Sequence, residues 1–449
     1  MLNQGACMDL MQSLIQISNN LLIAPFIFIF LSNILISIKT RFIQIRMLPT
    51  MIRLFFAKNG KRDESNPNTL PSRQAVLTVI STSLGIGNLV GPIIAIQLGG
   101  PGAFIGFALA VFFGAATIFA EVRFALIYRK KLPDGSWSGG PMPYLKKSIG
   151  NWAAYAYALG GAFLLLSWSA TQANIFADIC KTYTISPAIT GTAIAALVLI
   201  YLLGGIRKIG DLSSKIVPLM FGIITAIALW IIAANITSLP SVVWFSIKEA
   251  FTPKALGGAG IGLMLRWAIS KGTMASEAAA GTSTIPNSQA ETNNPYNQAI
   301  MAMLSAYAVL FISTMVGLLV LLTGSYAEPT LGLGVPVLAH AFTQYIPGSL
   351  SGIILLIAIF LFAFGTIIGN AYNGGQCFLY ITKNRWLKGY YLVVAAMLIF
   401  GAIFPVEFIW STLDVFIIPV ALINLWAIFK LLFKHKKIHH LPEMETTGN

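Results

Sequence analysis

The sequence predicts an all-α, polytopic membrane protein with about 11 transmembrane helices. Two observations predict this class. First, the 449 residues are 56% hydrophobic and only 10% charged, so the chain has too few polar side chains to cover a water-soluble domain of this size. Second, mostly apolar segments of about 20 residues, the length that a helix needs to cross the hydrocarbon core, recur along the chain with charges at their ends.

Eleven such segments follow one another. The first, 21–38, ends before Lys39, and a basic stretch separates it from the second. The second to the sixth segments cover 72–96, 102–128, 151–180, 187–204 and 213–234. The last five cover 257–285, 297–322, 349–382, 388–404 and 410–433, and Lys254, Lys383 and Lys434 mark their ends. Most segments are rich in Gly, Ala and Ser, which is typical of helices packed closely in one bundle. A transmembrane β-barrel would show strict alternation instead, which 159–166 and 353–364 lack.

The basic residues predict the orientation. The net charge is +14, and a nucleic-acid-binding protein would also be basic. Here, however, 24 of the 29 Lys and Arg residues fall on one side of the membrane if every segment crosses it. By the positive-inside rule, that side is the cytoplasm, so the N-terminus is expected outside and the C-terminus inside. We therefore expect a bacterial plasma (inner) membrane protein that does not bind nucleic acid.

Other features predict less. Residues 1–20 lack the basic start and the cleavage site of a signal peptide, so the first segment is expected to be retained. Segment 40–58 alternates arginines with apolar residues and is expected to lie as a helix on the cytoplasmic interface. The three cysteines, Cys7, Cys180 and Cys377, fit no metal spacing and are expected to be free. A solvated tail is favoured over a metal site for His435, His439 and His440.

Two segments look interrupted. Transporters often place two broken helices at corresponding positions of an inverted repeat, where the backbone can bind substrate. If the first segment is an extra helix, the other ten divide five and five, and each half begins with an interrupted segment. One carries Gly85-Ile86-Gly87-Asn88 and the other Ser276-Glu277 followed by small residues. The expected divisions are 1–71, with the first helix and interfacial segment; 72–236 and 237–433, the two repeats; and 434–449, a cytoplasmic tail.

Several motifs carry a family resemblance. They are Gly85-Ile86-Gly87-Asn88, Leu98-Gly99-Gly100-Pro101-Gly102-Ala103, Phe119-Ala120-Glu121, Gly139-Gly140-Pro141-Met142, Thr171-Gln172-Ala173-Asn174 and Lys271-Gly272 through Ser276-Glu277-Ala278. In this order and spacing, the chain resembles the alanine or glycine:cation symporter family over about residues 20–430. The resemblance implies a leucine-transporter-type fold with ten core helices in a 5+5 inverted repeat. It also implies an amino-acid substrate and sodium coupling.

The substrate site is expected at the breaks. A zwitterionic amino acid needs amide donors for its carboxylate, and the backbone around Gly85, Ile86 and Gly87 can supply them at a helix N-terminus. Gln172 and Asn174 are the first side-chain candidates, because a buried amide is costly without a polar partner; hydrogen bonding between helices is the alternative. The other expected substrate contacts are Ser83, Ser276 and Asn370.

Three residues depart from the family pattern. Ile86 stands where the family has Thr, Asn370 where it has Trp, and Ser276 where it has Asn. The Asn370 replacement is expected to enlarge or polarise the pocket. Alanine is therefore not a secure substrate.

A sodium site is implied by the resemblance. It would use the carbonyls of Ser81, Leu84 and Phe362 and the hydroxyl of Thr366, as a hard cation prefers oxygen ligands. The family often has two adjacent hydroxyl residues on this helix, and here the pair is Gly365-Thr366. Because one oxygen ligand is missing, proton coupling stays open as an alternative to sodium.

Carboxylates within membrane segments are candidates for coupling or gating, because burying them in lipid is costly. Glu277 is a candidate to accept a proton, to contact an ammonium group or to pair with Lys271. Glu121 is a candidate for a gate or an interfacial ion pair beside Arg123.

The predicted function is cation-coupled symport of a small neutral amino acid into the cytoplasm, with sodium favoured. The alternatives are a proton-coupled carrier of another small solute and a channel. An enzyme is not expected, because no His-Glu-x-x-His or Gly-x-Ser-x-Gly pattern occurs.

Overall fold

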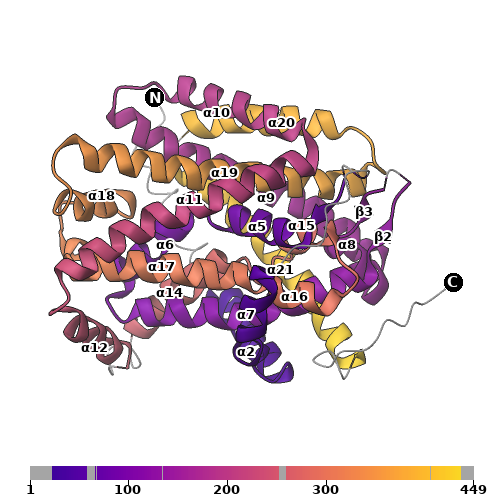
Figure 1. Cartoon of the computed structure of the whole chain (residues 1–449), viewed down its shortest axis with the longest axis horizontal. Coiled ribbons are helices and arrows are strands. Elements are labelled where there is room, and N and C mark those ends of the chain that lie inside the picture. Colours follow the sequence, from indigo (N-terminus) through magenta and orange to yellow (C-terminus); the bar gives the residue numbers. More distant parts are fainter. Residues whose placement is uncertain are drawn as a thin grey trace, which may run out of the picture.

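The structure is nearly all helical (Figure 1). The computed structural model describes residues 23–57, 66, 68–133, 135–251, 259–404 and 406–435, with backbone alone for 23, 259–266 and 406–415. Cys7, Lys58, Lys61, Arg62, Lys254, Lys436, Lys437, His439 and His440 lie outside the described residues, as do residues 1–20. Cys180 and Cys377 are buried and free, which confirms the prediction for these two.

The helices of the first half begin with the extra N-terminal helix and the expected interfacial segment. In chain order they are α2 (Ile23–Lys39), α3 (Ile43–Arg46), α4 (Leu48–Phe56), α5 (Ser72–Ser83), α6 (Ile86–Gly99), α7 (Ala103–Tyr128), α8 (Pro141–Ser148), α9 (Asn151–Thr182), α10 (Pro187–Leu202) and α11 (Gly205–Ala234). The helix α8 was not expected; it is short and carries Lys146 and Lys147 in its last turn.

The second half has a similar alternation of long and short helices. These are α12 (Leu239–Ala250), α14 (Ala259–Ser276), α15 (Thr284–Ser288), α16 (Pro295–Ala302), α17 (Leu304–Leu322), the 3₁₀ helix η1 (Ser325–Ala327), α18 (Val335–Thr343), α19 (Ser349–Ile381), α20 (Leu387–Ile403) and α21 (Val406–Lys434). Two small strand pairs occur in the described residues, and the first joins segments that are distant in the sequence. β1 (Leu70–Pro71) pairs in parallel with β4 (Ala290–Glu291), and β2 (Lys130–Lys131) pairs antiparallel with β3 (Trp137–Ser138).

Each of the 11 predicted segments falls on helices of the structure. Within the described residues, six spans are long and apolar enough to cross a membrane: α7, α9, α11, α16 with α17, α19, and the Phe416–Lys434 part of α21. The bent pair α5 and α6 makes a seventh, and α2, α10 and α20 contain shorter apolar helices. The structure therefore has the helices of a polytopic membrane protein, and the number of crossings stays a prediction.

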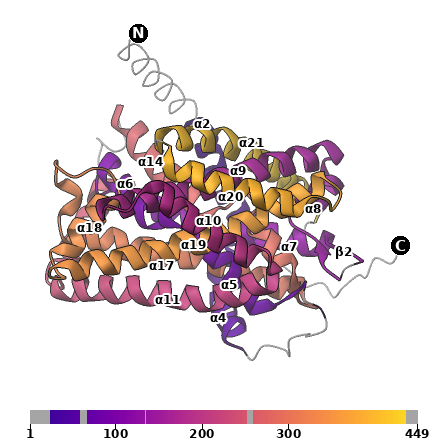
Figure 2. The same ribbon diagram turned by 90° about the horizontal axis from the view of Figure 1, so that it is seen from above.

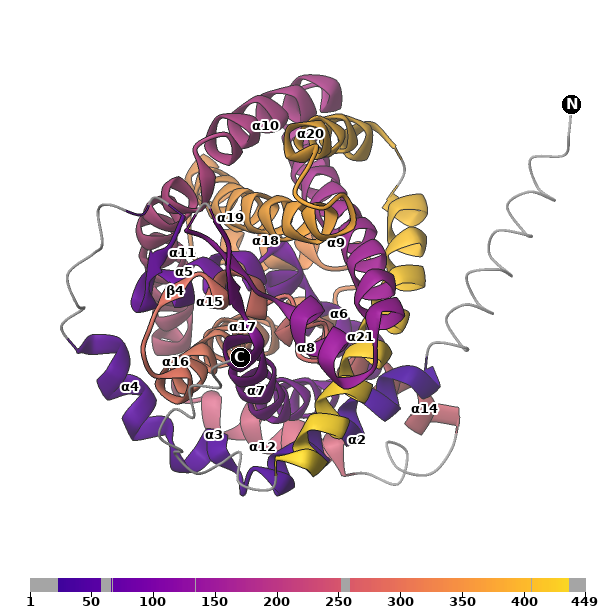
Figure 3. The ribbon, with the colours of Figure 1, turned by 90° about the vertical axis from the view of Figure 1, so that its right-hand side faces the viewer.

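Helices α11, α17 and α19 run along the longest axis of the molecule (Figure 1). Helix α18 lies at one end of this axis, and β2 and α8 lie at the other (Figure 2). Seen end-on, α6 and α15 lie near the centre, with α7, α9, α11 and α19 around them (Figure 3). The helices that follow the two predicted breaks, α6 and α15, thus lie inside a group of longer, continuous helices.

Candidate substrate and cation site

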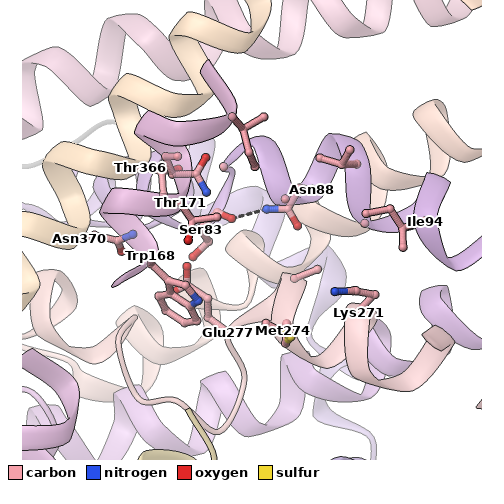
Figure 4. Close-up of a pocket in the computed structure, with 17 residues that line it drawn as sticks. Ser83, Asn88, Ile94, Trp168, Thr171, Lys271, Met274, Glu277, Thr366 and Asn370 are labelled. Atoms are coloured by element: carbon pink, nitrogen blue, oxygen red, sulfur yellow. Dashed lines mark hydrogen bonds between the residues drawn. The ribbon is translucent and has the colours of Figure 1, made fainter. Parts of the chain in front are cut away.

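The first predicted break lies between α5 and α6, which meet at 47°. Helix α5 ends at Ser83 and α6 begins at Ile86, so Leu84 and Gly85 form the bend. The Ile86 amide donates a hydrogen bond of 2.9 Å to Gln172 Oε1 on α9, and the Asn88 side-chain amide donates to the Ser83 carbonyl (Figure 4). Side chains therefore take up backbone groups that the interrupted helix leaves without helical partners.

Gly85 is needed for space rather than for its dihedral angles. Its φ of −89° is open to any residue. A Cβ at this position would lie 3.0 Å from Gln172 Nε2 and 3.1 Å from Thr366 Oγ1. At Gly87, by contrast, a Cβ would have nothing within 4 Å. Gly85 thus lets α9 and α19 approach the bend, while Gly87 leaves open space beside it.

The second break separates α14 from α15. After Ser276 the chain adopts left-handed conformations at Glu277 (φ 53°), Ala279 (φ 76°) and Gly281 (φ 75°). Such angles are unfavourable for residues with a side chain and persist only where surrounding contacts enforce them. The Glu277 carboxylate accepts a 2.5 Å hydrogen bond from the Thr282 hydroxyl, and the Tyr157 hydroxyl donates to the Ala280 carbonyl at 2.5 Å.

A cavity of about 140 Å³ lies between the two breaks. Its wall is formed by the α5–α6 bend, one face of α9, the C-terminal half of α14 and the middle of α19 (Figure 4). Polar groups line it at Ser83, Gln172, Glu277, Thr366 and Asn370, and Lys271 also contributes. This volume is well above the roughly 10–15 Å³ that a cavity needs to hold a single water, which suits a small solute.

Five of the eight predicted substrate contacts line this cavity: Ser83, Gly85, Gly87, Gln172 and Asn370. The other three lie outside its lining. The Ile86 side chain is fully buried, and its amide is bonded to Gln172. The Ser276 hydroxyl donates to the Thr273 carbonyl, and it would lie 3.0 Å from a Cβ at Gly114 of α7. Ser276 therefore faces α7.

Asn174 ties two helices together. Its amide donates to the carbonyls of Gly401 (2.7 Å) and Phe404 (2.8 Å) at the end of α20. In a helix of 3.6 residues per turn, residues two apart point about 200° apart. Gln172 and Asn174 on α9 therefore cannot both face the cavity, and the structure gives Asn174 the interhelical role that was the alternative.

The α9 face also supplies lining residues that the sequence reasoning missed. Trp168, Thr171 and Ile175 line the cavity together with Gln172. They follow the i, i+3, i+4, i+7 spacing of one helix face. Once Gln172 had been chosen, this periodicity could have identified them.

Two residues of the predicted sodium site, Ser81 and Thr366, meet between the end of α5 and α19. The Thr366 hydroxyl donates to the Ser81 carbonyl at 3.2 Å. A Cβ at Gly365 would lie 2.5 Å from the Ser81 hydroxyl oxygen and 3.4 Å from the Ser81 carbonyl oxygen. The Ser81 hydroxyl therefore occupies the space that a side chain at position 365 would need. Leu84 follows Ser81 at the end of α5, and Phe362 precedes Thr366 by one turn on α19. Both side chains are fully buried.

Glu121 lies outside the cavity lining, in a separate buried network. Its carboxylate accepts a 2.6 Å hydrogen bond from the Asn424 amide of α21. Asn424 also donates to the Ala279 carbonyl at 2.8 Å and accepts from the Tyr144 hydroxyl of α8 at 2.5 Å. Arg123 points elsewhere, over the Tyr296 ring. Glu121 is thus linked through Asn424 to the loop that follows α14.

The geometry is that of a small, partly open site at two helix breaks, and the comparisons identify the family. The model of the sodium:alanine symporter family matches residues 8–441. The chain belongs to this family. The sodium/alanine symporter AgcS of Methanococcus maripaludis is 30% identical over 431 residues, 93% of this chain and 94% of that protein. The amino-acid carrier protein AlsT of Bacillus subtilis is 30% identical over 398 residues, 87% and 83% of the two chains.

A solved structure shares the fold. It is the substrate-bound outward-open state of a Na⁺-coupled sialic acid symporter, with a TM-score of 0.58, 16% identity and coverage of 89% of this chain and 86% of that one. Relatives of this chain in the sodium:alanine symporter family are named as transporters, so this member is a membrane transporter and not an enzyme. Family and fold together support cation-coupled amino-acid symport.

Proposed function

We propose that this protein imports a small neutral amino acid into the cytoplasm together with sodium. The observation that carries the proposal is the cavity beside two helix breaks, which Gly87, with open space beside it, and Glu277 both line. The experiment that tests it is uptake into proteoliposomes under an imposed sodium gradient, with radiolabelled L-alanine and L-glutamine as probes.

The substrate carboxylate binds at the start of α6. First-turn amides of a helix have no intrahelical partner, and the helix dipole favours an anion there. The backbone amide of Ile86 already donates to the Gln172 side chain, and the backbone amide of Asn88 donates to the Gly85 carbonyl at 3.0 Å. The Gly87 amide lies between these two, at a position without a side chain. Glu277 also lines the cavity and attracts the substrate ammonium group.

Sodium binds where α5 meets α19, and the residues present fit a hard cation. The set consists of the carbonyls of Ser81, Leu84 and Phe362 and the hydroxyl of Thr366. The Ser81 hydroxyl occupies the space that a side chain at position 365 would need. It therefore adds an oxygen ligand in place of the hydroxyl that Gly365 lacks. When bound, sodium would favour the bent form of the α5–α6 segment because the bend supplies part of its ligands.

A proton is the alternative coupling ion, and one observation favours keeping it. Glu277 is a carboxylate with only 7% exposure at a helix break beside the cavity. A buried carboxylate that exchanges a proton during transport is a common device in carriers. Glu121, joined to the α14–α15 loop through Asn424, is proposed to act in gating, because movement of that loop must break or carry along these hydrogen bonds.

The proposed architecture is 11 crossings, namely α2 and two five-helix repeats at 72–236 and 237–433, in a bacterial plasma membrane. Each proposed repeat has its helix break in its first membrane-spanning segment, so the two breaks lie at corresponding positions. By the positive-inside rule, the distribution of basic residues favours the β2–β3 end in the cytoplasm and the η1–α18 end outside, with the N-terminus outside and the C-terminus inside.

Cysteine labelling tests this orientation. In a background without the natural cysteines, Lys131→Cys should react with a membrane-impermeant maleimide only after the cells are opened, whereas Thr330→Cys should react in intact cells. Both positions are exposed in the structure. The reverse pattern would contradict the proposed topology.

A further inference from the structure

Asn370 of α19 is a buried amide without a partner. It has no exposed surface, it lines the cavity, and neither its Nδ2 nor its Oδ1 makes a hydrogen bond. Among the side chains that the structure describes, no other buried amide has both polar atoms unpartnered. Because buried polar groups are nearly always hydrogen-bonded, an exception at a binding cavity indicates a group that a ligand satisfies.

The position of Asn370 suits the side chain of a substrate. Asn370 follows Thr366 by one helical turn on the same face of α19, about 6 Å along the axis. Thr366 in turn packs close to Gly85 at the bend. Figure 4 shows Asn370 on the side of the cavity where Ser83, Trp168 and Thr366 lie. A substrate whose carboxylate sits at Gly87 can therefore extend its side chain toward Asn370.

Three of the other polar groups around the cavity already have partners, whereas the buried Oδ1 of Asn88, which also lines it, has none. Gln172 accepts from the Ile86 amide, Thr366 donates to the Ser81 carbonyl, and Glu277 accepts from Thr282. None of the three makes a hydrogen bond to Asn370 in the structure. A ligand in the cavity can supply both an acceptor for Nδ2 and a donor for Oδ1.

We propose that the cavity selects a neutral amino acid whose side chain ends in a carboxamide, and that Asn370 is the residue that determines this specificity. A carboxamide pairs with the Asn370 amide through one donated and one accepted hydrogen bond. A methyl side chain would leave both Asn370 atoms unpaired. A carboxylate side chain has no donor for Oδ1 and would be repelled by Glu277. This inference rests on the proposed function and names its substrate class.

The test is equilibrium binding to the purified full chain in sodium-containing buffer, by calorimetry, with L-glutamine, L-asparagine, L-alanine, L-serine and L-glutamate. We expect at least one carboxamide amino acid to bind roughly tenfold or more tightly than L-alanine, since one satisfied buried polar group accounts for about one order of magnitude. This comparison needs no variant. Asn370→Leu should remove the preference while L-alanine still binds.

Thermal stability separates specificity from folding. Replacing an unpartnered amide by an apolar side chain of similar size should leave the melting temperature unchanged or raise it. The matched control is Asn174→Ala on α9, a buried amide that is bonded to the α20 carbonyls. It should lower the melting temperature and leave the ratio of glutamine to alanine binding unchanged.

The outcomes distinguish this inference from the function on which it rests. Sodium-dependent binding of L-alanine or L-serine at least as tight as that of L-glutamine and L-asparagine would overturn the carboxamide assignment and leave symport intact. A carboxamide preference that survives Asn370→Leu would overturn the role of Asn370. If none of the five amino acids binds, both this inference and the proposed substrate class fail.

Discussion

Gly87→Leu should abolish substrate binding while the protein still folds. A Cβ at Gly87 would meet no atom within 4 Å, so the new side chain extends into the cavity and does not collide with the surrounding helices. It then occupies the space proposed for the substrate carboxylate. Forcing a ligand against such an added side chain costs about 3 kcal/mol at the upper end of measured overpacking, which corresponds to a loss of roughly a hundredfold or more in affinity.

The control for this substitution is Gly222→Leu. A Cβ added at Gly222 of α11 would also meet nothing within 4 Å, but this residue is exposed and does not line the cavity. Binding of L-alanine and L-glutamine, expression level and melting temperature should be measured for both variants. A well-folded Gly87→Leu protein that binds either amino acid as the wild type does would refute the site at the bend.

Ser81→Ala should weaken sodium binding, and moving the hydroxyl to the neighbouring helix should restore it. Loss of one oxygen ligand to a charged group costs about 1.5–3 kcal/mol, or roughly a ten- to hundredfold rise in the sodium concentration needed for half-saturation. In Ser81→Ala/Gly365→Ser, the new hydroxyl on α19 takes the space that the Ser81 hydroxyl left. The double variant should therefore bind sodium nearly as the wild type does.

Gly365→Ser alone completes the cycle. Its Cβ would lie 2.5 Å from the Ser81 hydroxyl oxygen, so the two hydroxyls compete for one space and the melting temperature should fall. Sodium binding is best measured without substrate, as the sodium-dependent rise in melting temperature. Thr82→Val is the matched control, because the Thr82 hydroxyl packs against Gly369 in the same way but donates to the Thr78 carbonyl. Equal sodium dependence in Ser81→Ala and the wild type would exclude the Ser81 hydroxyl as a ligand.

The positions of the long helices could be predicted from the sequence because lipid solvation leaves a strong local signal. The segment predicted at 349–382 is the helix Ser349–Ile381. Helix α11 begins at Gly205, eight residues before the predicted 213. Hydropathy missed its first turns because they carry the charged residues Arg207, Lys208 and Asp211. Hydropathy marks the part of a helix that lies in lipid and says nothing about its polar extension. Short helices such as α12 lack even that signal.

Side-chain roles were harder to predict because they depend on which face of a helix meets which neighbour. The amide composition of α9 singled out Gln172 and Asn174 alike, yet only Gln172 faces the cavity. Helical spacing within α9 could have separated them. No local pattern, however, connects Glu121 with Asn424, which lies 303 residues away. The position of the Ser81 hydroxyl beside Gly365 likewise depends on the approach of α5 to α19.

The most direct test of cation-coupled symport is uptake of radiolabelled L-alanine and L-glutamine into proteoliposomes under an imposed sodium gradient or an imposed pH gradient. The proposed mechanism predicts concentrative uptake of at least one of them when the sodium gradient is inward, and a raised sodium requirement in Thr366→Ala. If the proton is the coupling ion instead, the pH gradient drives uptake and Glu277→Gln abolishes it. Equilibration without accumulation under both gradients, in a preparation that binds its substrate, would contradict symport.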